Sequence, residues 1–346
     1  MSRIPVGVCA YSFAYAIGWM RGMELEGQRR MTAEDLIRLA TEHGLSGVEL
    51  PPQMLGEGET PARIRELLDS LGLYLVLDGG LVLSGPLEEW IQTAHTLGAR
   101  TLRLTLSRVL CGDRSEMAGH WQEHLNAIAS RLQAVEPLAR KLGVSLALEN
   151  HQDADSDDLR SLCERIGSPV IGVNLDVGNA LAVGEDPLEF AKKVAPFLKN
   201  VHLKDYQMVR SPEGYRLVRC AVGEGVVDWP GIFQILEEQA STATCNIELG
   251  AIKERHIRLF TPEWWAHYPA RDVRTLLGPL RLLATHGLPP ETETRVPIDR
   301  GESVQAQLAY EMGQFQASVA YLKRLFQKRS GEDASAGALR PESRGV

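Results

Sequence analysis

The sequence predicts an α/β protein that forms a closed (β/α)8 barrel with a C-terminal helical extension. Short apolar runs alternate with amphipathic stretches along the chain, which is typical of βα units and a parallel sheet. Eight such units fit within residues 1–290, whereas an open doubly wound sheet usually has five or six strands and would leave units unplaced. The hydrophobic fraction of 44% and the charged fraction of 24% are ordinary for a globular chain of 346 residues.

The strands are predicted from short apolar runs that are rich in β-forming residues. The first is followed by a long loop and a helix in TAEDLIRLATEHG, for which Thr32 is the expected N-cap and Gly44 the expected C-cap. The eight strands are expected at residues 4–9, 46–50, 73–78, 100–106, 144–149, 170–176, 200–204 and 244–249. Helices are expected near residues 60–71, 86–97 and 118–142, and after each later strand.

Residues 205–228 form a longer connection than the other strand-to-helix loops. Within it, VRSPEGYRLVRC is typical of a small hairpin that turns at Pro212-Glu213-Gly214. The loop GEGVVDWPG that follows has two glycines spaced as in a phosphate-binding loop, but Asp228 stands where the third glycine should be. We therefore interpret this loop as structural.

The residues after the barrel are predicted as a helical extension over 291–329, with one amphipathic helix over 301–329. This helix would either cover a surface between copies of the chain, giving a homo-oligomer, or cover the barrel floor. The last segment, 330–346, is polar and Gly-rich, and we predict that it is disordered.

Charge and cysteine content narrow the function classes. A net charge of −8 argues against a nucleic-acid surface, because phosphate binding normally needs a basic balance. The five cysteines are scattered without a CxxC pair, which favours a reduced, cytoplasmic protein. The N-terminal residues do not have the pattern of a signal peptide, and the sequence has no apolar run of about 18 residues that could span a membrane.

Four successive late strands end in residues that can bind a metal ion. These residues are Glu149, Asp176, His202 and Glu248, and about one βα unit separates each from the next, apart from a longer last gap that holds the hairpin. The carboxyl ends of the strands meet at one mouth of a (β/α)8 barrel, where active sites lie. We therefore expect the four side chains to converge near the barrel axis, although any one of them alone could be a loop start or, for Asp176, a cap.

Three carboxylates and one imidazole suit a single hard or borderline divalent ion. We expect Mn²⁺, with Mg²⁺, Co²⁺ and Zn²⁺ also compatible with these donors. Without a cation, carboxylates crowded in this way would repel one another and raise one another's pKa.

The segments that carry these residues resemble a known family. SLALENHQD, IGVNLDVGNALAVGEDPLEF, KNVHLKD and CNIELG are similar to the sugar phosphate isomerase/epimerase family, whose fold is a xylose isomerase-like TIM barrel. The similarity covers roughly residues 4–290. It implies that Glu149, Asp176, His202 and Glu248 bind one divalent metal and that Glu149 and Glu248 face opposite sides of the substrate as base and acid. A carbonyl polarised by a metal makes the neighbouring C–H acidic enough for a carboxylate to remove its proton.

Two departures leave the reaction open between isomerisation and elimination. Ketose epimerases of the family commonly have a substrate-binding His three residues after the metal Asp, where this chain has Asn179. His151 follows Glu149 by two residues, so on a continuing strand it would point to the same side and could act as a base. A similar Glu-x-His arrangement occurs in family members that cleave 3-keto glycosides. The alternative is that His151 only hydrogen-bonds a neighbouring group.

Further residues near the predicted mouth are candidates for substrate binding. Lys204 could hold an anionic or hydroxyl group, or pair with a neighbouring carboxylate. Glu49, at the end of the second strand, could bind a hydroxyl or cap a helix. In KERHIRLFTPEWWAHYP, Arg255 suits a carboxylate or phosphate, and the indole rings of Trp264 and Trp265 suit the C–H faces of a sugar or pack against the C-terminal helix.

The sequence thus predicts a metal-dependent isomerase or epimerase of a small keto sugar or sugar derivative. The alternative is a lyase that uses the same metal site: a dehydratase, a 3-keto-glycoside-cleaving enzyme or a sugar-acid decarboxylase. Cleavage of abasic DNA would need further metal histidines and a basic track, and a sugar-binding barrel without catalysis is the remaining alternative. We expect a small-molecule substrate and neither nucleic acid nor membrane as a partner.

Overall fold

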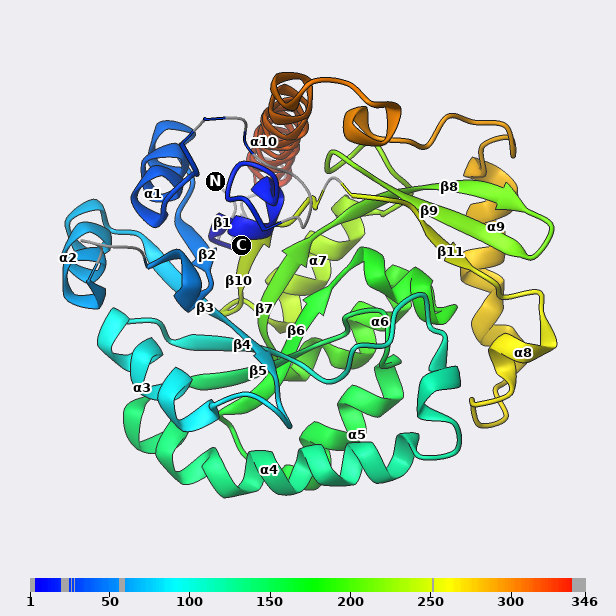
Figure 1. Cartoon of the computed structure of the whole chain (residues 1–346), viewed down its shortest axis with the longest axis horizontal. Coiled ribbons are helices and arrows are strands. Elements are labelled where there is room, and N and C mark those ends of the chain that lie inside the picture. Colours follow the sequence, from blue (N-terminus) through cyan, green and yellow to red (C-terminus); the bar gives the residue numbers. More distant parts are fainter. Residues whose placement is uncertain are drawn as a thin grey trace, which may run out of the picture.

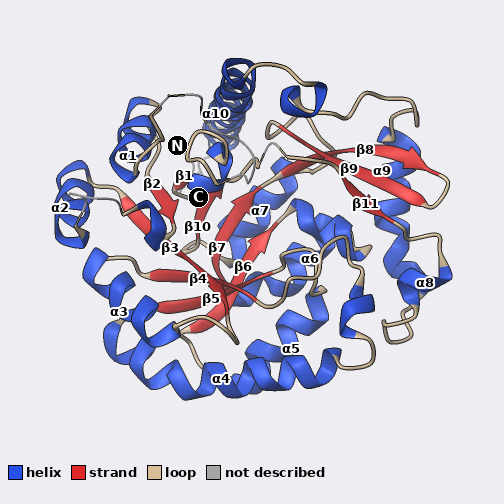
Figure 2. Ribbon diagram, in the orientation of Figure 1, coloured by secondary structure: helices blue, strands red, loops and turns tan. Residues whose placement is uncertain are grey.

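The computed structural model of the protein describes residues 4–19, 25, 27, 29–55, 60–250 and 252–337. Eight parallel strands close into a barrel, and helices surround it (Figures 1 and 2). This confirms the predicted fold class. In their order around the barrel the strands are β1 (Val6–Cys9), β10 (Thr244–Ile247), β7 (Leu198–Leu203), β6 (Ile171–Asp176), β5 (Ser145–Glu149), β4 (Thr101–Thr105), β3 (Tyr74–Leu81) and β2 (Gly47–Leu50).

The helices that cover the barrel lie close to their predicted positions. Thr32 caps α1 through a capping box, in which its side chain accepts from the Asp35 N–H and the Asp35 side chain accepts from the Thr32 N–H. The helices between successive strands are α1 (Ala33–Glu42), α2 (Pro61–Leu71), α3 (Leu87–Leu97), α4 (Trp121–Leu142), α5 (Ser156–Ile166), α6 (Pro187–Val194) and α7 (Trp229–Gln239). Within the described residues, no helix combines the length and apolar character that a membrane span requires.

The predicted C-terminal helix is present as α10 (Val304–Gly337), and residues 338–346 of the segment predicted to be disordered lie outside the described residues. The helix α10 packs between the first and last barrel helices, α1 and α7. Phe315 contacts His43 at the end of α1, and Phe326 contacts Phe233 of α7. Phe315 also packs on Phe13, with ring centroids 5.3 Å apart. The helix therefore occupies the place of the eighth barrel helix, beside β1 in Figure 1.

A small antiparallel sheet lies beside the barrel mouth (Figure 2). The predicted hairpin is confirmed as β8 (Asp205–Ser211) and β9 (Gly214–Cys220), which turn between Ser211 and Gly214. A third strand, β11 (Arg255–Ile257), pairs with β9 and was not predicted, because three residues are too few to show a pattern. The helices α8 (Pro262–Trp265) and α9 (Leu277–His286) follow it.

The glycine-rich loop after the hairpin is structural, as predicted. The Asp205 carboxylate accepts hydrogen bonds from the backbone N–H groups of Gly223, Gly225 and Val227, and from the indole of Trp229. A side chain at Gly225 would come within 2.1 Å of this carboxylate, so the loop needs glycine there. The loop thus folds around an anion of its own chain, which leaves no room for a phosphate.

Candidate active site

The four predicted metal ligands converge at the carboxyl ends of neighbouring strands. Glu149 and Asp176 end β5 and β6, His202 lies next to Asp176 in the β6–β7 register, and Glu248 directly follows β10. Each of the four offers one ligand atom, and these atoms all lie within 4.8 Å of one another. All four residues are buried, so the cluster lies inside the barrel mouth and not on its rim.

The ligand atoms in this cluster have no hydrogen-bond partners. Both Oε atoms of Glu149, Oδ1 of Asp176, Nδ1 of His202 and Oε2 of Glu248 are buried and make no hydrogen bond. Nδ1 of His202 lies 2.7 Å from Oε2 of Glu248 but without hydrogen-bond geometry. A buried polar atom without a partner costs roughly 1–3 kcal/mol. Of these five atoms only Glu149 Oε2 has an ion-pair partner outside the cluster, so the cluster needs an external partner. Three carboxylates and an imidazole around one point fit a divalent cation.

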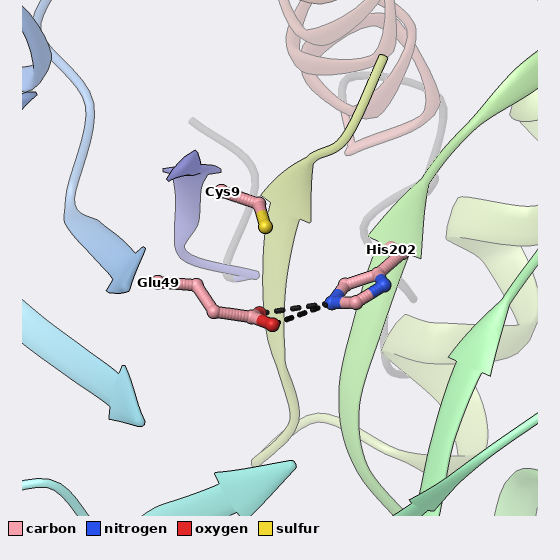
Figure 3. A group of neighbouring side chains, drawn as sticks. All are labelled: Cys9, Glu49 and His202. Atoms are coloured by element: carbon pink, nitrogen blue, oxygen red, sulfur yellow. Dashed lines mark hydrogen bonds and ion pairs between the residues drawn. The ribbon is translucent and has the colours of Figure 1, made fainter. Parts of the chain in front are cut away.

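The other side of the His202 ring is fully engaged. Its Nε2 lies 2.9 Å from both carboxylate oxygens of Glu49 (Figure 3). A carboxylate on one ring nitrogen fixes the proton there and leaves the lone pair of the other nitrogen for a metal. With a metal on Nδ1 the ring would keep its proton on Nε2. Burial lowers the pKa of His202, but the Glu49 and Glu248 carboxylates more than offset this effect and raise the pKa well above its usual range, so a metal would replace a proton on Nδ1.

Glu49 lies below the cluster, inside the barrel, and has no exposed surface. In addition to His202, its carboxylate accepts from Asn200 Nδ2 at 3.0 Å and Asn246 Nδ2 at 3.1 Å. These contacts give no support to the expectation that Glu49 binds a substrate hydroxyl. Sequence reasoning missed the two asparagines, although each precedes a metal-ligand candidate by two residues and therefore points to the same side of its strand.

Two cations hold the carboxylates in place. Lys204 Nζ lies 2.6 Å from Asp176 Oδ2 and 3.0 Å from Glu248 Oε1, which agrees with pairing to a neighbouring carboxylate. Arg103 Nη1 lies 3.0 Å from Glu149 Oε2. Burial raises the pKa of Glu149, but Arg103 and His151 more than offset this effect and bring the pKa down to about 2. For Asp176, burial raises the pKa to about 7 in spite of Lys204.

A cavity of about 620 Å³ opens next to the cluster and is large enough for a small sugar. Its lining includes Tyr11, Trp19, Arg103, Arg108, His151 and Glu248. Burial lowers the pKa of His151 to about 4, so the imidazole is neutral at neutral pH and can accept a proton. The strand ends at Glu149, and Gln152, directly after His151, has a φ of 71°. This turn, and not a continuing strand, brings His151 to the cavity.

Backbone and amide contacts position Asp176. Asn150 donates from Nδ2 to the Asp176 carbonyl at 2.9 Å and accepts from the Asp176 N–H at 2.7 Å. Asn179 donates to Asp176 Oδ2 at 2.6 Å and accepts from the Tyr206 hydroxyl at 2.9 Å. Asn179 thus contacts a metal-ligand candidate directly. Asn150 binds the backbone of the same residue, which no sequence pattern indicated.

The remaining candidates for substrate contact are not among the residues that line the 620 Å³ cavity. Trp264 is 4% exposed and donates from its indole to the Cys111 carbonyl, and Trp265 donates to the Leu259 carbonyl. Both rings pack with Tyr268 in a second apolar cluster that is separate from the main core. None of the residues described for this cluster belongs to α10, the helix that the rings were expected to contact. Arg255 begins β11 and is partly exposed.

Comparison with known proteins agrees with the site geometry. Residues 37–259 match the family described as xylose isomerase-like TIM barrel. The chain belongs to this family. The resemblance inferred from the four strand-end segments is therefore confirmed.

Curated relatives of the chain are named for different reactions. The chain is 24% identical over 227 residues to the 3-oxo-isoapionate decarboxylase of Pectobacterium atrosepticum, covering 64% of this chain and 78% of that protein. It is 26% identical over 129 residues to the inosose dehydratase of Bacillus thuringiensis, covering 33% of this chain and 43% of that protein.

Solved structures show the same fold. L-ribulose 3-epimerase is similar with a TM-score of 0.54 and 15% identity, over 99% of this chain and 100% of that one. A xylose isomerase-like TIM barrel protein from Mycobacterium smegmatis in complex with magnesium has a TM-score of 0.52 and 17% identity, over 82% of this chain and 97% of that one. At these identities the likeness concerns the fold alone.

Proposed function

We propose that this chain is a divalent-metal-dependent isomerase or epimerase of a small keto sugar or sugar derivative. The observation that carries the proposal is the set of five buried ligand atoms without hydrogen-bond partners, beside a cavity of sugar size. An arrangement of this kind is costly in a merely structural core. Glu149 Oε2 has an ion pair with Arg103 Nη1 at 3.0 Å, but the other four atoms have lost their water without gaining a hydrogen bond.

Glu149, Asp176, His202 and Glu248 would hold the metal, for which we propose Mn²⁺ because carboxylates and one imidazole are its preferred donors. When bound, a divalent ion supplies Lewis-acid polarisation of a substrate carbonyl. Lys204 and Asn179 orient Asp176, and Glu49 orients His202, so the donor atoms stay in place when a ligand exchanges.

Proton transfer falls to two carboxylates of the cluster, of which Glu248 lines the cavity. Glu149 has a pKa of about 2 and is ionised at neutral pH, so it can remove a proton next to a carbonyl. Glu248 lines the cavity and approaches the cluster from β10, three strands away from β5 around the barrel, so it would serve the opposite face of the substrate. Delivery of a different proton from Glu248, which must first take one up from solvent, to the other face gives an epimer. Transfer of the abstracted proton from Glu149 to the neighbouring carbon gives an isomer.

A lyase on a keto sugar is the second candidate, and His151 is the observation that favours it. This neutral imidazole lines the same cavity as Glu248 and gives the site a third proton-transfer group, which a two-base epimerisation does not need. Asn179 in place of the epimerase histidine, together with the decarboxylase and dehydratase relatives, also supports this reading. Loss of water needs the same proton abstraction next to a carbonyl, followed by departure of the hydroxyl group as water. Loss of carbon dioxide from a keto acid instead breaks the C–C bond to the carboxylate, leaves its electron pair as an enolate, and needs a group that protonates the resulting carbon.

Incubation of the manganese-loaded protein with a panel of ketoses and keto-sugar acids in D₂O tests both candidates. Deuterium uptake at the carbon next to the carbonyl, with conversion to an epimer or isomer and no loss of mass, would support the leading proposal. Release of water or carbon dioxide would favour the lyase. Absence of deuterium uptake and of water or carbon dioxide release with every substrate, in a protein shown by elemental analysis to hold the metal, would refute both.

A further inference from the structure

One face of the small sheet beside the barrel mouth carries two arginines without an acidic partner. Arg219 in β9 is 8% exposed, and its Nη1 donates only to the carbonyls of Ile252 and Lys253, at 3.4 and 3.3 Å. Its Nε is buried and has no hydrogen-bond partner. Arg255 at the start of β11 also has a buried Nε without a partner, and no hydrogen bond or ion pair of its side chain occurs in the described part of the chain.

The strand register puts the two arginines on the same face. Arg255 lies opposite Leu217 in the β9–β11 pairing, and Arg219 follows Leu217 by two residues. Side chains two residues apart on a strand share a face, so the two guanidinium groups are diagonal neighbours. Burial and the nearby Arg219 both lower the pKa of Arg255, which agrees with two like charges close together.

This face is turned toward the active site. Tyr206 lies opposite Arg219 in the β8–β9 pairing, and the Arg219 guanidinium lies 5.8 Å from the Tyr206 ring. The Tyr206 hydroxyl donates to Asn179, which in turn donates to the metal-ligand candidate Asp176. Two hydrogen bonds therefore connect the ring beside Arg219 to the candidate metal cluster.

The backbone next to the arginines is kept clear of side chains. Gly250 follows Glu248 by two residues and has a φ of +53°. A side chain there would come within 3.2 Å of Tyr11, which lines the 620 Å³ cavity, and within 3.5 Å of Arg219 Nε. Glycine at this position therefore leaves space where the edge of the cavity meets the unpaired arginine.

We propose that Arg219 and Arg255 form an anion subsite that binds a carboxylate or phosphate substituent of the substrate. This substituent would lie at the opposite end of the substrate from the carbonyl whose neighbouring carbon loses its proton. The inference rests on the proposed function and narrows its substrate class to sugar acids or sugar phosphates. Guanidinium groups suit both anions because their N–H donors match pairs of oxygens. An anion here would supply the partners that both Nε atoms lack.

Arg216 provides a matched control on the same strand. It lies on the opposite face of β9 from Arg219, and its Nη1 is already paired with the Glu254 carboxylate at 3.3 Å. An arginine-to-glutamine change at 216 removes the same charge from the same sheet without touching the proposed subsite.

The test is calorimetric titration of the metal-free full chain, at low ionic strength, with inorganic phosphate, D-gluconate and, as a neutral control, D-sorbitol. We expect at least one of the two anions to bind and sorbitol not to bind. Arg219→Gln and Arg255→Gln should each weaken anion binding at least tenfold, whereas Arg216→Gln should change it less than twofold. Preference for phosphate would assign a phosphorylated substrate, and preference for gluconate a sugar acid.

The proposal is overturned if neither anion binds to the wild-type chain, or if Arg216→Gln weakens binding as much as the other two changes. Should Arg219→Gln fail to fold, Arg219→Lys and the more exposed Arg255→Gln still decide the outcome. Because this titration uses no metal and no turnover, its result is independent of the proposed reaction. Anion binding without turnover would refute the reaction alone, and deuterium exchange in neutral ketoses without anion binding would refute the subsite alone.

Discussion

The two sides of the His202 ring differ in whether the groups that face them are hydrogen-bonded. Both sides carry buried groups that can bind metals: Glu149, Asp176 and Glu248 on the Nδ1 side, and Glu49 with Cys9 on the Nε2 side (Figure 3). On the Nδ1 side, none of the facing atoms makes a hydrogen bond. On the Nε2 side, Glu49 accepts from His202, Asn200, Asn246 and Arg103. Burial alone therefore does not mark a functional site, whereas burial without hydrogen-bond partners does.

The protonation of the Cys9 thiol is a second difference between the two sides of the His202 ring. Burial raises the pKa of its thiol well above the ordinary value, and the Glu49 carboxylate raises it further. A thiol that keeps its proton is a poor metal ligand, because the thiolate is the form that binds. The Nε2 side therefore has the residue types of a metal site, but a metal that bound there would have to displace a tightly held thiol proton.

The largest expected effect follows from a change on the unsatisfied side. Glu149→Gln removes the ionised base and one metal-ligand candidate, so we expect turnover in the D₂O exchange assay to fall roughly 10³-fold or more. Bound manganese, measured by elemental analysis after dialysis, should fall as well. The control is Glu89→Gln on the exposed surface of α3, which should change neither quantity. Retained turnover in Glu149→Gln would mean that another group is the base.

A change on the satisfied side should act mainly on stability. Glu49→Gln leaves the buried His202 and Arg103 without one of their acidic partners, and breaking a buried pair in this way typically costs about 3–5 kcal/mol. Metal affinity should fall about 10- to 100-fold, because the ring loses the group that orients it. Urea unfolding of the metal-free protein measures the first effect and metal titration the second. The contrast fails if Glu149→Gln destabilises the metal-free protein more than Glu49→Gln does.

The sequence was sufficient to predict the barrel and the groups on the Nδ1 side of His202, where the facing atoms make no hydrogen bond. Strand periodicity and the rule that active sites lie at the carboxyl ends of barrel strands do not depend on atomic detail. Glu149, Asp176, His202 and Glu248 each end or follow a strand, so their convergence needed only the order of the strands.

The satisfied side could not be predicted in the same way. Glu49 contacts Asn200 and Asn246 across the barrel interior, so their meeting depends on the stagger of strands that are far apart in sequence. The Trp264 and Trp265 rings were expected above the mouth or against the C-terminal helix, but they pack on Tyr268. No short-range pattern predicts which of several neighbours a large ring will meet.

Glu311 in α10 shows how hydrogen bonds without an ion pair affect a buried carboxylate. It is a buried carboxylate that accepts from the backbone N–H groups of Tyr15 and Ala16, but unlike Glu49 it has no ion pair within the described residues. Burial raises its pKa from 4.5 to about 7, which these two hydrogen bonds do not prevent. A buried carboxylate with partners but no cation thus still resists ionisation.

The sign of the resulting pH dependence follows from linkage. Between about pH 4.5 and 7 the folded chain holds the Glu311 proton more tightly than the unfolded chain does, so this contribution to stability is complete at low pH and is lost as the pH rises. The loss amounts to at most about 3 kcal/mol. Glu311→Gln should flatten this part of the urea-unfolding stability profile against pH, with Glu302→Gln, in an exposed pair with Arg300, as the control. An unchanged slope in Glu311→Gln would contradict the raised pKa.

The smallest expected effect concerns Cys9, and it is the sharpest test of the contrast. Cys9→Ala removes a sulfur that accepts one weak hydrogen bond, from the Tyr11 N–H at 3.4 Å, so we expect a stability loss of only about 1 kcal/mol. Because the protonated thiol is not a ligand, the protein should bind one manganese ion per chain both before and after the change, with affinities that agree within twofold. A second ion in the wild-type chain that disappears in Cys9→Ala would mean that the Nε2 side is itself a metal site. Hydrogen-bond satisfaction around Glu49 would then no longer separate the two sides of His202.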